Sequence, residues 1–481
     1  MRKIIAARRT AERYSLGLFH NIAPGGDSIY GWCVGGALCS PVNLAIEGAP
    51  VTTTMMFTRF GAFSIASLLC VCASAAGAHS ATSKSQDSVA YQITPGHTGN
   101  IAFTAGFSSS LTQLWSINLN GEISYPLTAK HTAFVTVGTS GASLLVAINL
   151  SSGRVVWEKL LPGSSPWADA VYDSGNIYVV NGTGNLQAFE ASHGKKLWST
   201  QLPQGSYSTG YGAPAAGNGI VALQYNNDYS QYVGSYQAAT GTNNWTIEPG
   251  YEASTDIAGV PLVEKNGIYL GAYNETGSAP FFDFSPSDGS TIWTTTLSCS
   301  SASAPVSSGQ DLYVTAYSSY DDCNGGNSIL SLSTGATKGA FSGSVSPAIL
   351  GKTVIVSIDG VLYDYSPKSD NVYWTFSGEG ELDSSPIVIN GYVAALSSQN
   401  ENLYLLDGST GAQLWTTTLP YNYNCCVDGP DTGLGAGEGV LLVPYEGTLY
   451  AFAPQQGAKL GSRPEPTHVI GRMVNGRYVP N

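Results

Sequence analysis

Short runs of alternating apolar residues, each followed by a polar turn and a second short run, recur along most of this chain. The clearest copy has an apolar run at 403–406, a turn at 407–411 and a return run that ends at Trp415. In the turn, Asp407 can bond nearby backbone and Gly411 can supply a positive φ. This order of residues predicts a strand, a tight turn and a second strand.

Eight copies of this unit can be counted, and their ends are mostly 41 to 48 residues apart. A second signal has the same period, namely a proline, an apolar run and a glycine, followed by another expected strand. A period of this length that holds four short strands is typical of propeller blades. One four-stranded sheet cannot bury both of its faces, so the blades must stack around an axis. The prolines of the second signal are Pro126, Pro214, Pro261, Pro305, Pro347 and Pro386.

The two ends of the repeat indicate how the ring closes. The last copy, at 449–460, ends without an aromatic residue, while the strand around Trp115 has no partner unit before it. Joining the two would remove two exposed sheet edges. We therefore predict an all-β fold, an eight-bladed β-propeller of four-stranded antiparallel blades closed by the N-terminal strand, with seven blades as the alternative. Large residues that end the outer strands are expected to pack between blades, and they are Trp115, Trp157, Trp198, Trp245, Trp293, Phe341, Trp374 and Trp415.

The composition agrees with this architecture. The 481 residues include 57 Gly and 24 Pro, and only 11% are charged, as in a turn-rich all-β chain. An eight-bladed ring uses nearly all of the chain that follows the front segment, so one domain is expected there.

An apolar run near the front of the chain predicts a secretory signal peptide. Arg59 precedes this run, which ends in small residues that offer cleavage after Ala75 or Ala78. A membrane anchor is the alternative, although the run is short for one. The expected organisation is an upstream extension outside the natural protein at 1–54, a signal peptide at 55–78, a flexible leader at 79–93, the propeller at 94–462 and a loose C-terminal tail at 463–481.

Two further observations bear on location and partners. Cys70 and Cys72 follow Leu69 and Val71, whereas a bacterial lipoprotein signal has a small residue before its cysteine. We therefore expect an exported protein, periplasmic or extracellular, with no stable membrane anchor, and a monomer. From residue 81 onward the chain has 14 Lys and Arg against 30 Asp and Glu, hence a net charge of −16. Such a surface repels phosphate backbones and disfavours nucleic-acid binding.

The repeated unit resembles a known family. "LYLLDGSTGAQLW" at 403–415, "LYAFAPQQGAKL" at 449–460 and "LQAFEASHGKKLW" at 186–198 resemble the pyrroloquinoline-quinone (PQQ)-like propeller repeat. The opening "LWSINLNGEISYPL" at 114–127 is similar to the start of the BamB-like subgroup. The resemblance covers roughly residues 110–460. Enzymes, scaffolds and sensors share this repeat, so it indicates the fold more specifically than the function.

Two subgroups give different expectations. The resemblance to quinoprotein alcohol dehydrogenases would imply PQQ and calcium on the propeller axis, with Glu, Asn and Asp ligands that cannot be matched residue by residue here. The resemblance to BamB-like proteins would imply a protein-binding scaffold without a cofactor. The lean blades favour the second subgroup, so no cofactor is expected. PQQ and calcium belong to the alternative, and a glycan-binding propeller is a second alternative.

The longest loops are expected to share one face of the propeller, which we call the long-loop face. They connect outer to inner strands, as at 204–213, 250–260 and 421–434, or join middle strands, as at 317–327. Tyr supplies rigid area and a hydroxyl, so this face suits a protein or glycan, although packing within the loops explains the tyrosines equally well. The candidate residues are Tyr207, Tyr211, Tyr229, Tyr251, Asp256, Tyr320, Asp322, Tyr421 and Tyr423.

Four cysteines follow the expected signal peptide. Cys299 and Cys323 are expected on the same face of one blade, so a disulfide fits an exported protein. Cys425 and Cys426 are adjacent, and a disulfide between neighbours is strained and rare. A comparable pair lies beside PQQ in quinoprotein dehydrogenases, but early in the chain. We interpret this pair as a loop stiffener or as partners of other cysteines, ahead of a redox site.

No catalytic constellation is recognised. The histidines form no pair with metal-ligand spacing, and neither a nucleophile elbow nor a phosphate loop occurs. We therefore expect no catalytic residues and no metal ligands. The hypothesis from sequence is an exported, non-enzymatic PQQ-like propeller that binds a protein partner through its long-loop face, with a PQQ- and calcium-dependent oxidoreductase as the alternative.

Overall fold

The computed structural model divides the chain into two compact units, residues 1–79 and 80–481. The described residues are 17–22, 28–33, 40–41, 87–204, 209–227, 230–249, 259–272, 278–299, 301, 303–316, 326–382, 384–397, 400–420 and 432–481. In the first unit, β1 (Gly17–Ile22), β2 (Ser28–Cys33) and β3 (Ser40–Pro41) form an antiparallel sheet. The expected signal peptide at 55–78 lies outside the described residues.

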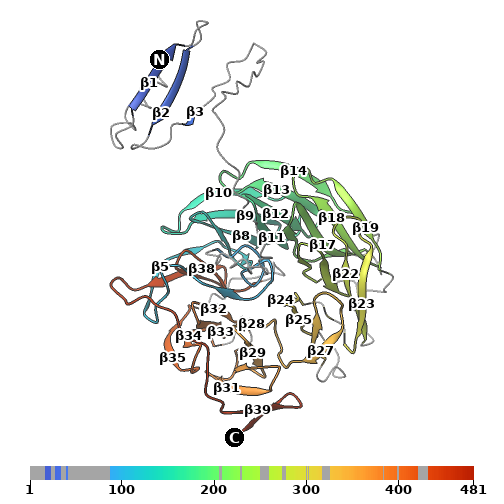
Figure 1. The fold of residues 1–481 in the computed structure, drawn as a ribbon, viewed down its shortest axis with the longest axis vertical. Coiled ribbons are helices and arrows are strands. Elements are labelled where there is room, and N and C mark those ends of the chain that lie inside the picture. Colours follow the sequence, from blue (N-terminus) through green and yellow to red (C-terminus); the bar gives the residue numbers. More distant parts are fainter. Residues whose placement is uncertain are drawn as a thin grey trace, which may run out of the picture. The chain divides into compact units, whose positions relative to one another are not determined.

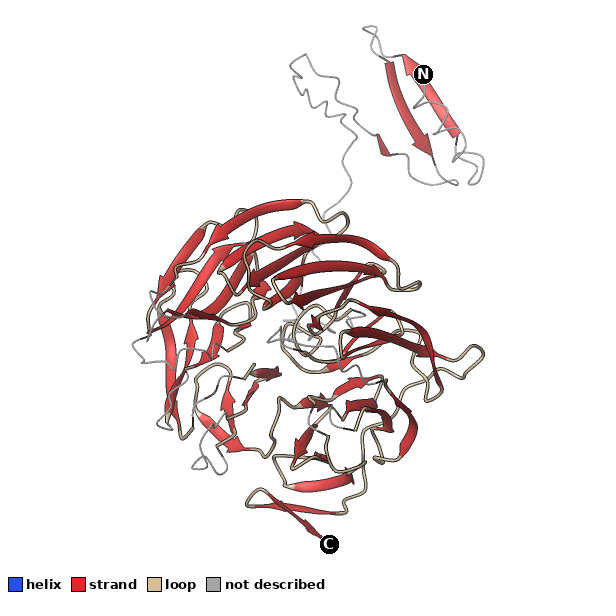
Figure 2. Cartoon of the chain, turned by 180° about the vertical axis from the view of Figure 1, so that it is seen from behind, coloured by secondary structure: helices blue, strands red, loops and turns tan. Residues whose placement is uncertain are grey.

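The second unit is an eight-bladed β-propeller (Figure 1), which confirms the predicted fold class. The described part of the chain contains only strands and loops (Figure 2). The strands of the first four blades are β6 (Glu122–Ile123), β7 (Leu127–Ala129), β8 (Thr132–Thr139), β9 (Ala142–Asn149) and β10 (Val155–Leu160) in blade 1; β11 (Ala168–Asp173), β12 (Asn176–Asn181), β13 (Asn185–Glu190) and β14 (Lys196–Gln201) in blade 2; β15 (Thr209–Tyr211), β16 (Ala215–Gly217), β17 (Ile220–Asn227), β18 (Ser230–Gln237) and β19 (Asn243–Ile247) in blade 3; and β20 (Leu262–Val263), β21 (Ile268–Gly271), β22 (Ala279–Phe284) and β23 (Thr291–Leu297) in blade 4.

Four further blades complete the ring. Their strands are β24 (Val306–Ser308), β25 (Asp311–Val314), β26 (Ser328–Ser331) and β27 (Thr337–Ala340) in blade 5; β28 (Ala348–Leu350), β29 (Thr353–Ile358), β30 (Val361–Tyr365) and β31 (Asn371–Phe376) in blade 6; β32 (Ile387–Ile389), β33 (Tyr392–Leu396), β34 (Asn402–Asp407) and β35 (Gln413–Thr418) in blade 7; and β36 (Gly435–Gly437), β37 (Val440–Tyr445), β38 (Thr448–Pro454) and β5 (Leu111–Asn118) in blade 8.

The N-terminal strand closes the ring as predicted. β5 pairs antiparallel with β38, and Trp115 lies opposite Ala451 in the register. Blade 8 thus takes its three inner strands from the C-terminal part of the propeller and its outer strand from the start. Neither the first nor the last blade is therefore left without a neighbour, and the backbone pairing of β5 with β38 joins the two ends of the ring.

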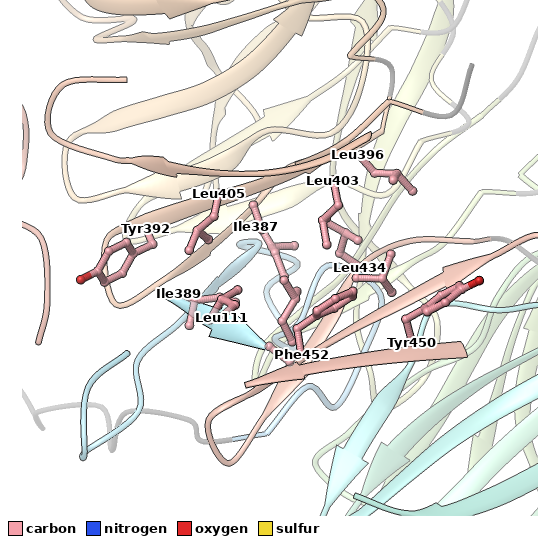
Figure 3. Close-up of a cluster of buried hydrophobic side chains, with 14 of the residues drawn as sticks. Leu111, Ile387, Ile389, Tyr392, Leu396, Leu403, Leu405, Leu434, Tyr450 and Phe452 are labelled. Atoms are coloured by element: carbon pink, nitrogen blue, oxygen red, sulfur yellow. The ribbon is translucent and has the colours of Figure 1, made fainter. Parts of the chain in front are cut away.

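The core lies between the blades, not within one central cluster. In the described residues, a cluster of buried apolar side chains fills the interface between each blade and the next around the whole ring. Between blades 7 and 8, for example, Leu403 and Leu405 of β34 face Phe452 of β38 (Figure 3). Burying each such side chain contributes roughly 1.5–3 kcal/mol, so the ring is stabilised mainly by blade-to-blade contact.

The blade-ending tryptophans bind each blade to the next. Trp157 of blade 1 donates its indole N–H to the carbonyl of Ala191 in blade 2, at 3.1 Å. Its ring also lies over the turn at Gly194, where a Cβ would come within 2.7 Å of the ring. The same relation holds for Trp115 with Gly153, Trp198 with Gly241, Trp245 with Gly289, Trp293 with Gly335 and Trp374 with Gly411.

The C-terminal tail, expected to be a loose extension, is ordered instead. β39 (Gly471–Val474) and β40 (Arg477–Pro480) form a hairpin that adds to β31, the outer strand of blade 6. Met473 is 6% exposed and packs in the cluster between blades 5 and 6. Upstream, the Arg463 backbone N–H donates to the carbonyl of Asn390 at 2.8 Å. The tail therefore belongs to the propeller because it covers a blade edge with apolar contacts.

No helix in the described residues is both long and apolar enough to span a membrane.

Candidate functional site

Residues 87–107 cross the propeller beside the turns that join first and second strands, and we call them the axial plug. Their backbone carbonyls accept hydrogen bonds from inner strands of widely separated blades. Ser88 accepts from Thr128 of blade 1 at 2.6 Å, and Gly96 accepts from Ser307 of blade 5 at 2.8 Å. Part of the plug, β4 (Asn100–Ile101), pairs parallel with β32 of blade 7. The plug therefore lies near the middle of the ring, next to the short turns that join first and second strands (Figure 1).

A flexible leader was expected at 79–93, but residues 87–93, the described part of that segment, are ordered in the plug. Of the described part of that segment, Ser88, Ala90, Gln92 and Ile93 are buried, and Ile93 has no exposed surface. No local pattern signals this burial, because the apolar Val89 and Tyr91 are half-buried whereas the smaller or polar Ala90 and Gln92 are buried.

His97 is the titratable centre of the plug. It is 1% exposed, and its Nδ1–H donates to the carbonyl of Pro305 at 2.9 Å. Burial lowers the pKa of His97 to about 4, although the bond to Pro305 acts in the opposite direction. The imidazole is therefore neutral at neutral pH, and it orders the plug without adding charge.

A cavity of about 500 Å³ lies on the other side of the plug. It is enclosed by inner parts of blades 1, 6, 7 and 8, and Tyr91 of the plug contributes to its wall. The ring of Tyr91 meets Tyr125 edge-on, with 5.4 Å between centroids. Leu396 and Leu434 line the cavity and also belong to the cluster between blades 7 and 8 (Figure 3). The cavity is thus bounded by rigid elements of four blades and by the plug.

The charges at this cavity are negative. Glu122 of blade 1 and Glu446 of blade 8 are among its lining residues, together with the hydroxyl groups of Ser384, Ser385 and Thr432. Partial burial raises the pKa of Glu446, and the charge of Glu401 raises it further. The described lining contains no Lys or Arg. An anionic ligand would therefore enter an unfavourable field.

The described lining offers no cationic side chain to the carboxylates of PQQ, although its glutamates are the kind of ligand that an accompanying calcium ion takes. It offers glutamates and hydroxyl groups where a carboxylate ligand needs cationic partners. Within the described ranges, no group of three or more His, Cys, Asp or Glu side chains is placed to hold a metal ion. No reaction step through PQQ is therefore derived for this cavity.

Comparison with known families decides the identity of this propeller. The family profile described as "Outer membrane protein assembly factor BamB", a PQQ-like repeat profile, matches residues 108–338 and 328–469. The chain belongs to this PQQ-like propeller family. The BamB protein of Moranella endobia is 25% identical over 193 residues, which cover 36% of this chain and 45% of that protein. The tetrathionate hydrolase of Acidithiobacillus ferrooxidans is 26% identical over 180 residues, which cover 26% of this chain and 36% of that protein. The matched stretches span less than half the length of these two curated relatives.

Solved structures of PQQ-like propellers share the fold. A europium-containing methanol dehydrogenase superimposes with a TM-score of 0.59 and 13% identity, covering 76% of this chain and 98% of that one. The quinohemoprotein alcohol dehydrogenase from Comamonas testosteroni superimposes with a TM-score of 0.59 and 12% identity, and the match covers 80% of this chain and 83% of that one. BamB from Moraxella catarrhalis superimposes with a TM-score of 0.54 and 15% identity, and the match covers 73% of this chain and 99% of that one. Identities this low establish the propeller fold alone.

Most predicted residues of the long-loop face lie outside the described part of this PQQ-like propeller. Tyr211 is described, at the end of β15, and it is only 7% exposed. Its ring lies 6.2 Å from that of Tyr225, which stacks on Tyr232 at 5.4 Å. Tyr211 thus packs in the apolar cluster between blades 2 and 3. The other candidates, all outside the described residues, are Tyr207, Tyr229, Tyr251, Asp256, Tyr320, Asp322, Tyr421 and Tyr423.

The cysteine predictions are reached only in part. Cys299 is 4% exposed and is disulfide-bonded. Cys323, Cys425 and Cys426 lie outside the described residues, so the pairing of Cys299 with Cys323 and the role of the adjacent pair stay predictions.

Sequence reasoning missed two buried carboxyl groups between blades. Asp283 and Asp364 stand opposite the blade tryptophans, in register with Trp293 and Trp374. Burial raises the pKa of Asp283 to about 7. Burial, and secondarily the charge of Glu465, raises the pKa of Asp364 to about 8. The alignment of repeats could have revealed them, because the same position holds Ala188 in blade 2 and Leu405 in blade 7.

Proposed function

We propose that this protein is an exported, non-enzymatic scaffold of the BamB-like kind, which binds a protein partner through its long-loop face. The observation that carries the proposal is the acidic cavity beside the plug, which is lined by residues of blades 1, 6, 7 and 8. Its described lining has two glutamates and no cationic side chain. Such a lining gives the carboxylates of PQQ no cationic partner, and loops carried on a propeller are a common place for a binding surface.

Two further features support this proposal. The plug is bonded to inner strands beside the short turns, and the cavity is lined by Tyr91 of the plug together with blades 1, 6, 7 and 8. The matching family profile and two of the similar proteins carry the name of BamB, an outer membrane protein assembly factor. The expected signal peptide and the disulfide at Cys299 support export to the periplasm or beyond.

The alternative is a PQQ- and calcium-dependent oxidoreductase. The likeness to two quinoprotein dehydrogenases favours it, since they superimpose at least as well as BamB does. The carboxylates of the cofactor would then be neutralised chiefly by the calcium ion, because the stretches of the propeller after residue 87 that lie outside the described ranges contain no Lys or Arg. The match to the tetrathionate hydrolase covers only 26% of this chain and supports the repeat, not a shared reaction.

Site-specific photo-crosslinking in the cell envelope tests the proposed face. A photoreactive residue at Thr432, exposed at the cavity on the long-loop side, is expected to give one discrete cross-linked partner. The matched control places the same residue at Lys352, exposed in the short turn of blade 6, and is expected to give none. Cross-linking from Lys352 alone, or from neither position, would contradict the proposal.

A further inference from the structure

The outer edge of blades 1 and 2 carries a surface that is both apolar and basic, which we call the blade 1–2 rim. On β10, Leu160 is 70% exposed and Val156 is 52% exposed. Lys159 lies beside them, and Lys195 and Lys196 approach from the start of blade 2. A protein normally exposes large apolar side chains singly, so a group of them on one edge strand indicates a contact surface. The rim consists of Val155, Val156, Lys159, Leu160, Lys195 and Lys196.

The rim includes a groove of about 530 Å³ between the two blades. Phe189 and Gln187 of β13 contribute to it, and the three lysines line it together with Leu160. Within the described residues none of these lysines forms an ion pair, although Glu158 is exposed on the same strand and Glu190 lies near Lys195. From position 81 onward the chain carries 30 acidic and 14 basic residues, so its net charge is negative. The three lysines give this groove a positive charge instead.

The backbone of β10 is also available for pairing. β10 is the outermost strand of its sheet and is paired to β9 on one side only. The propeller itself shows what such an edge can accept. At blade 6, β39 adds antiparallel to the outer strand β31, with Asn371 opposite Arg472 and Val372 opposite Gly471. The chain thus covers the outer edge of blade 6 with its own segment and leaves the apolar edge of blade 1 uncovered.

We propose that the blade 1–2 rim docks an extended segment of a partner protein that carries alternating apolar and acidic side chains. The segment adds as a further strand along β10, as β39 does along β31. Its apolar side chains cover Val156 and Leu160, and its carboxylates meet Lys159, Lys195 and Lys196. This surface lies on the outer circumference, so the inference is independent of the partner proposed for the long-loop face.

A titration with a defined peptide tests this inference. The probe is a fluorescein-labelled octapeptide of alternating Glu and Val, and a Lys–Val octapeptide of the same length is the control. We expect micromolar binding of the Glu–Val peptide and none of the Lys–Val peptide. The combined K159E, K195E and K196E reversal should weaken binding by at least about tenfold. A matched reversal of exposed lysines elsewhere, K265E, K352E and K459E, should change it less than about twofold.

Amide hydrogen exchange supplies the readout for strand addition. With peptide bound, the amides of Val155–Leu160 that point away from β9 should exchange at least about tenfold more slowly, while those of Asn371 and Val372, which already pair with β39, should not change. Leu160→Ser, at a mostly exposed side chain, is a second variant that should weaken the peptide without unfolding the blade. The inference is overturned by no binding at millimolar peptide, by equal loss in both triple variants, by unchanged exchange in β10, or by rim-dependent binding to phosphatidylserine vesicles in place of peptide.

Discussion

The indole N–H of Trp374 in blade 6 donates to the carbonyl of Gly408 in blade 7, at 2.8 Å. The same ring lies against Gly411, three residues further along the turn, where a Cβ would come within 2.7 Å. Gly411 also has a φ of +70°. Two requirements therefore favour glycine at position 411, a left-handed backbone and close contact with the tryptophan of the preceding blade.

Gly411→Ala should therefore lower the free energy of unfolding by about 2–4 kcal/mol, because left-handed strain and a clash with Trp374 add. Gly457→Ala is the matched control. Gly457 has a φ of +78° in the corresponding turn of blade 8, but nothing lies within 4 Å of its Cβ position. We expect the control to lose only about 1 kcal/mol. Urea unfolding of both variants measures the difference, and equal losses would show that the tryptophan contact is not the cause.

Asp364 should make the protein less stable as the pH rises. The pKa of its carboxyl is about 8 in the folded state, above the ordinary value near 3.8. The folded state therefore holds the proton more tightly, and the free energy of unfolding falls as the pH rises from about 4 to 8. Its oxygens accept no hydrogen bond within the described residues, since the hydroxyl of nearby Thr353 donates to the Leu350 carbonyl.

Asp364→Asn should remove the contribution of this carboxyl to the slope, leaving that of Asp283, and should make the variant the more stable protein at pH 9 by roughly 3–5 kcal/mol. At pH 5, where the carboxyl of Asp364 is protonated, the two proteins should have nearly equal free energies of unfolding. Asp288→Asn, in an exposed turn where hydrogen bonds from Ser285 and Ser290 lower the pKa, should leave the slope between pH 5 and 9 unchanged. Urea titrations at pH 5, 7 and 9 decide the matter, and an unchanged slope in Asp364→Asn would refute the prediction.

His97 should make the protein less stable as the pH falls below neutral, which is the opposite direction to the effect of Asp364. Its pKa is about 4 when folded and about 6.5 when unfolded, so the unfolded chain binds the proton more tightly. The stability it contributes is complete above pH 6.5 and is lost as the pH falls to 4, on the order of 3 kcal/mol. His97→Asn, which tolerates the positive φ of 54°, should abolish this loss. Limited proteolysis near residue 97 at pH 4 and pH 7 would show whether the plug is released, and identical cleavage at both values would contradict the prediction.

The C-terminal hairpin should stabilise blade 6 through one side chain above all. Met473 is buried between blades 5 and 6, so Met473→Ala should cost about 2–4 kcal/mol. Its neighbour Val474 is 49% exposed, and Val474→Ala should stay within about 0.5 kcal/mol. Thermal unfolding of the two variants is the measurement. Equal and small effects would mean that the tail is as loose as its sequence suggested.

The repeat could be read from the sequence because each of its signals is local. A tight turn, a glycine and an outer-strand aromatic such as Trp157 recur within a few residues, and their period defines the blade. Closure by the strand around Trp115 followed from one missing aromatic in the last copy. The plug and the hairpin were missed because they occur once and have no period. Ile93 and Met473 are buried by distant blades, and neither neighbourhood shows this in its composition.

The candidate cavity could not be predicted for a related reason. Tyr91, Glu122, Ser384 and Glu446 come from the plug and from blades 1, 7 and 8, and only ring closure brings them together. Sequence reasoning favoured the long loops instead, since loop length is visible in the repeat. Of the nine residues predicted there, Tyr211 alone lies in the described part of the chain, and it is buried between blades 2 and 3.

The central claim, a scaffold without a redox cofactor, is tested most directly by reconstitution. Purified mature protein is incubated with PQQ and calcium and desalted, and its quinone absorbance and metal content are then measured. A cavity lined by Glu122 and Glu446 and by no cationic side chain among the described residues predicts that neither is retained. Retention of one quinone and one calcium ion per chain would contradict the account and identify the protein as a quinoprotein.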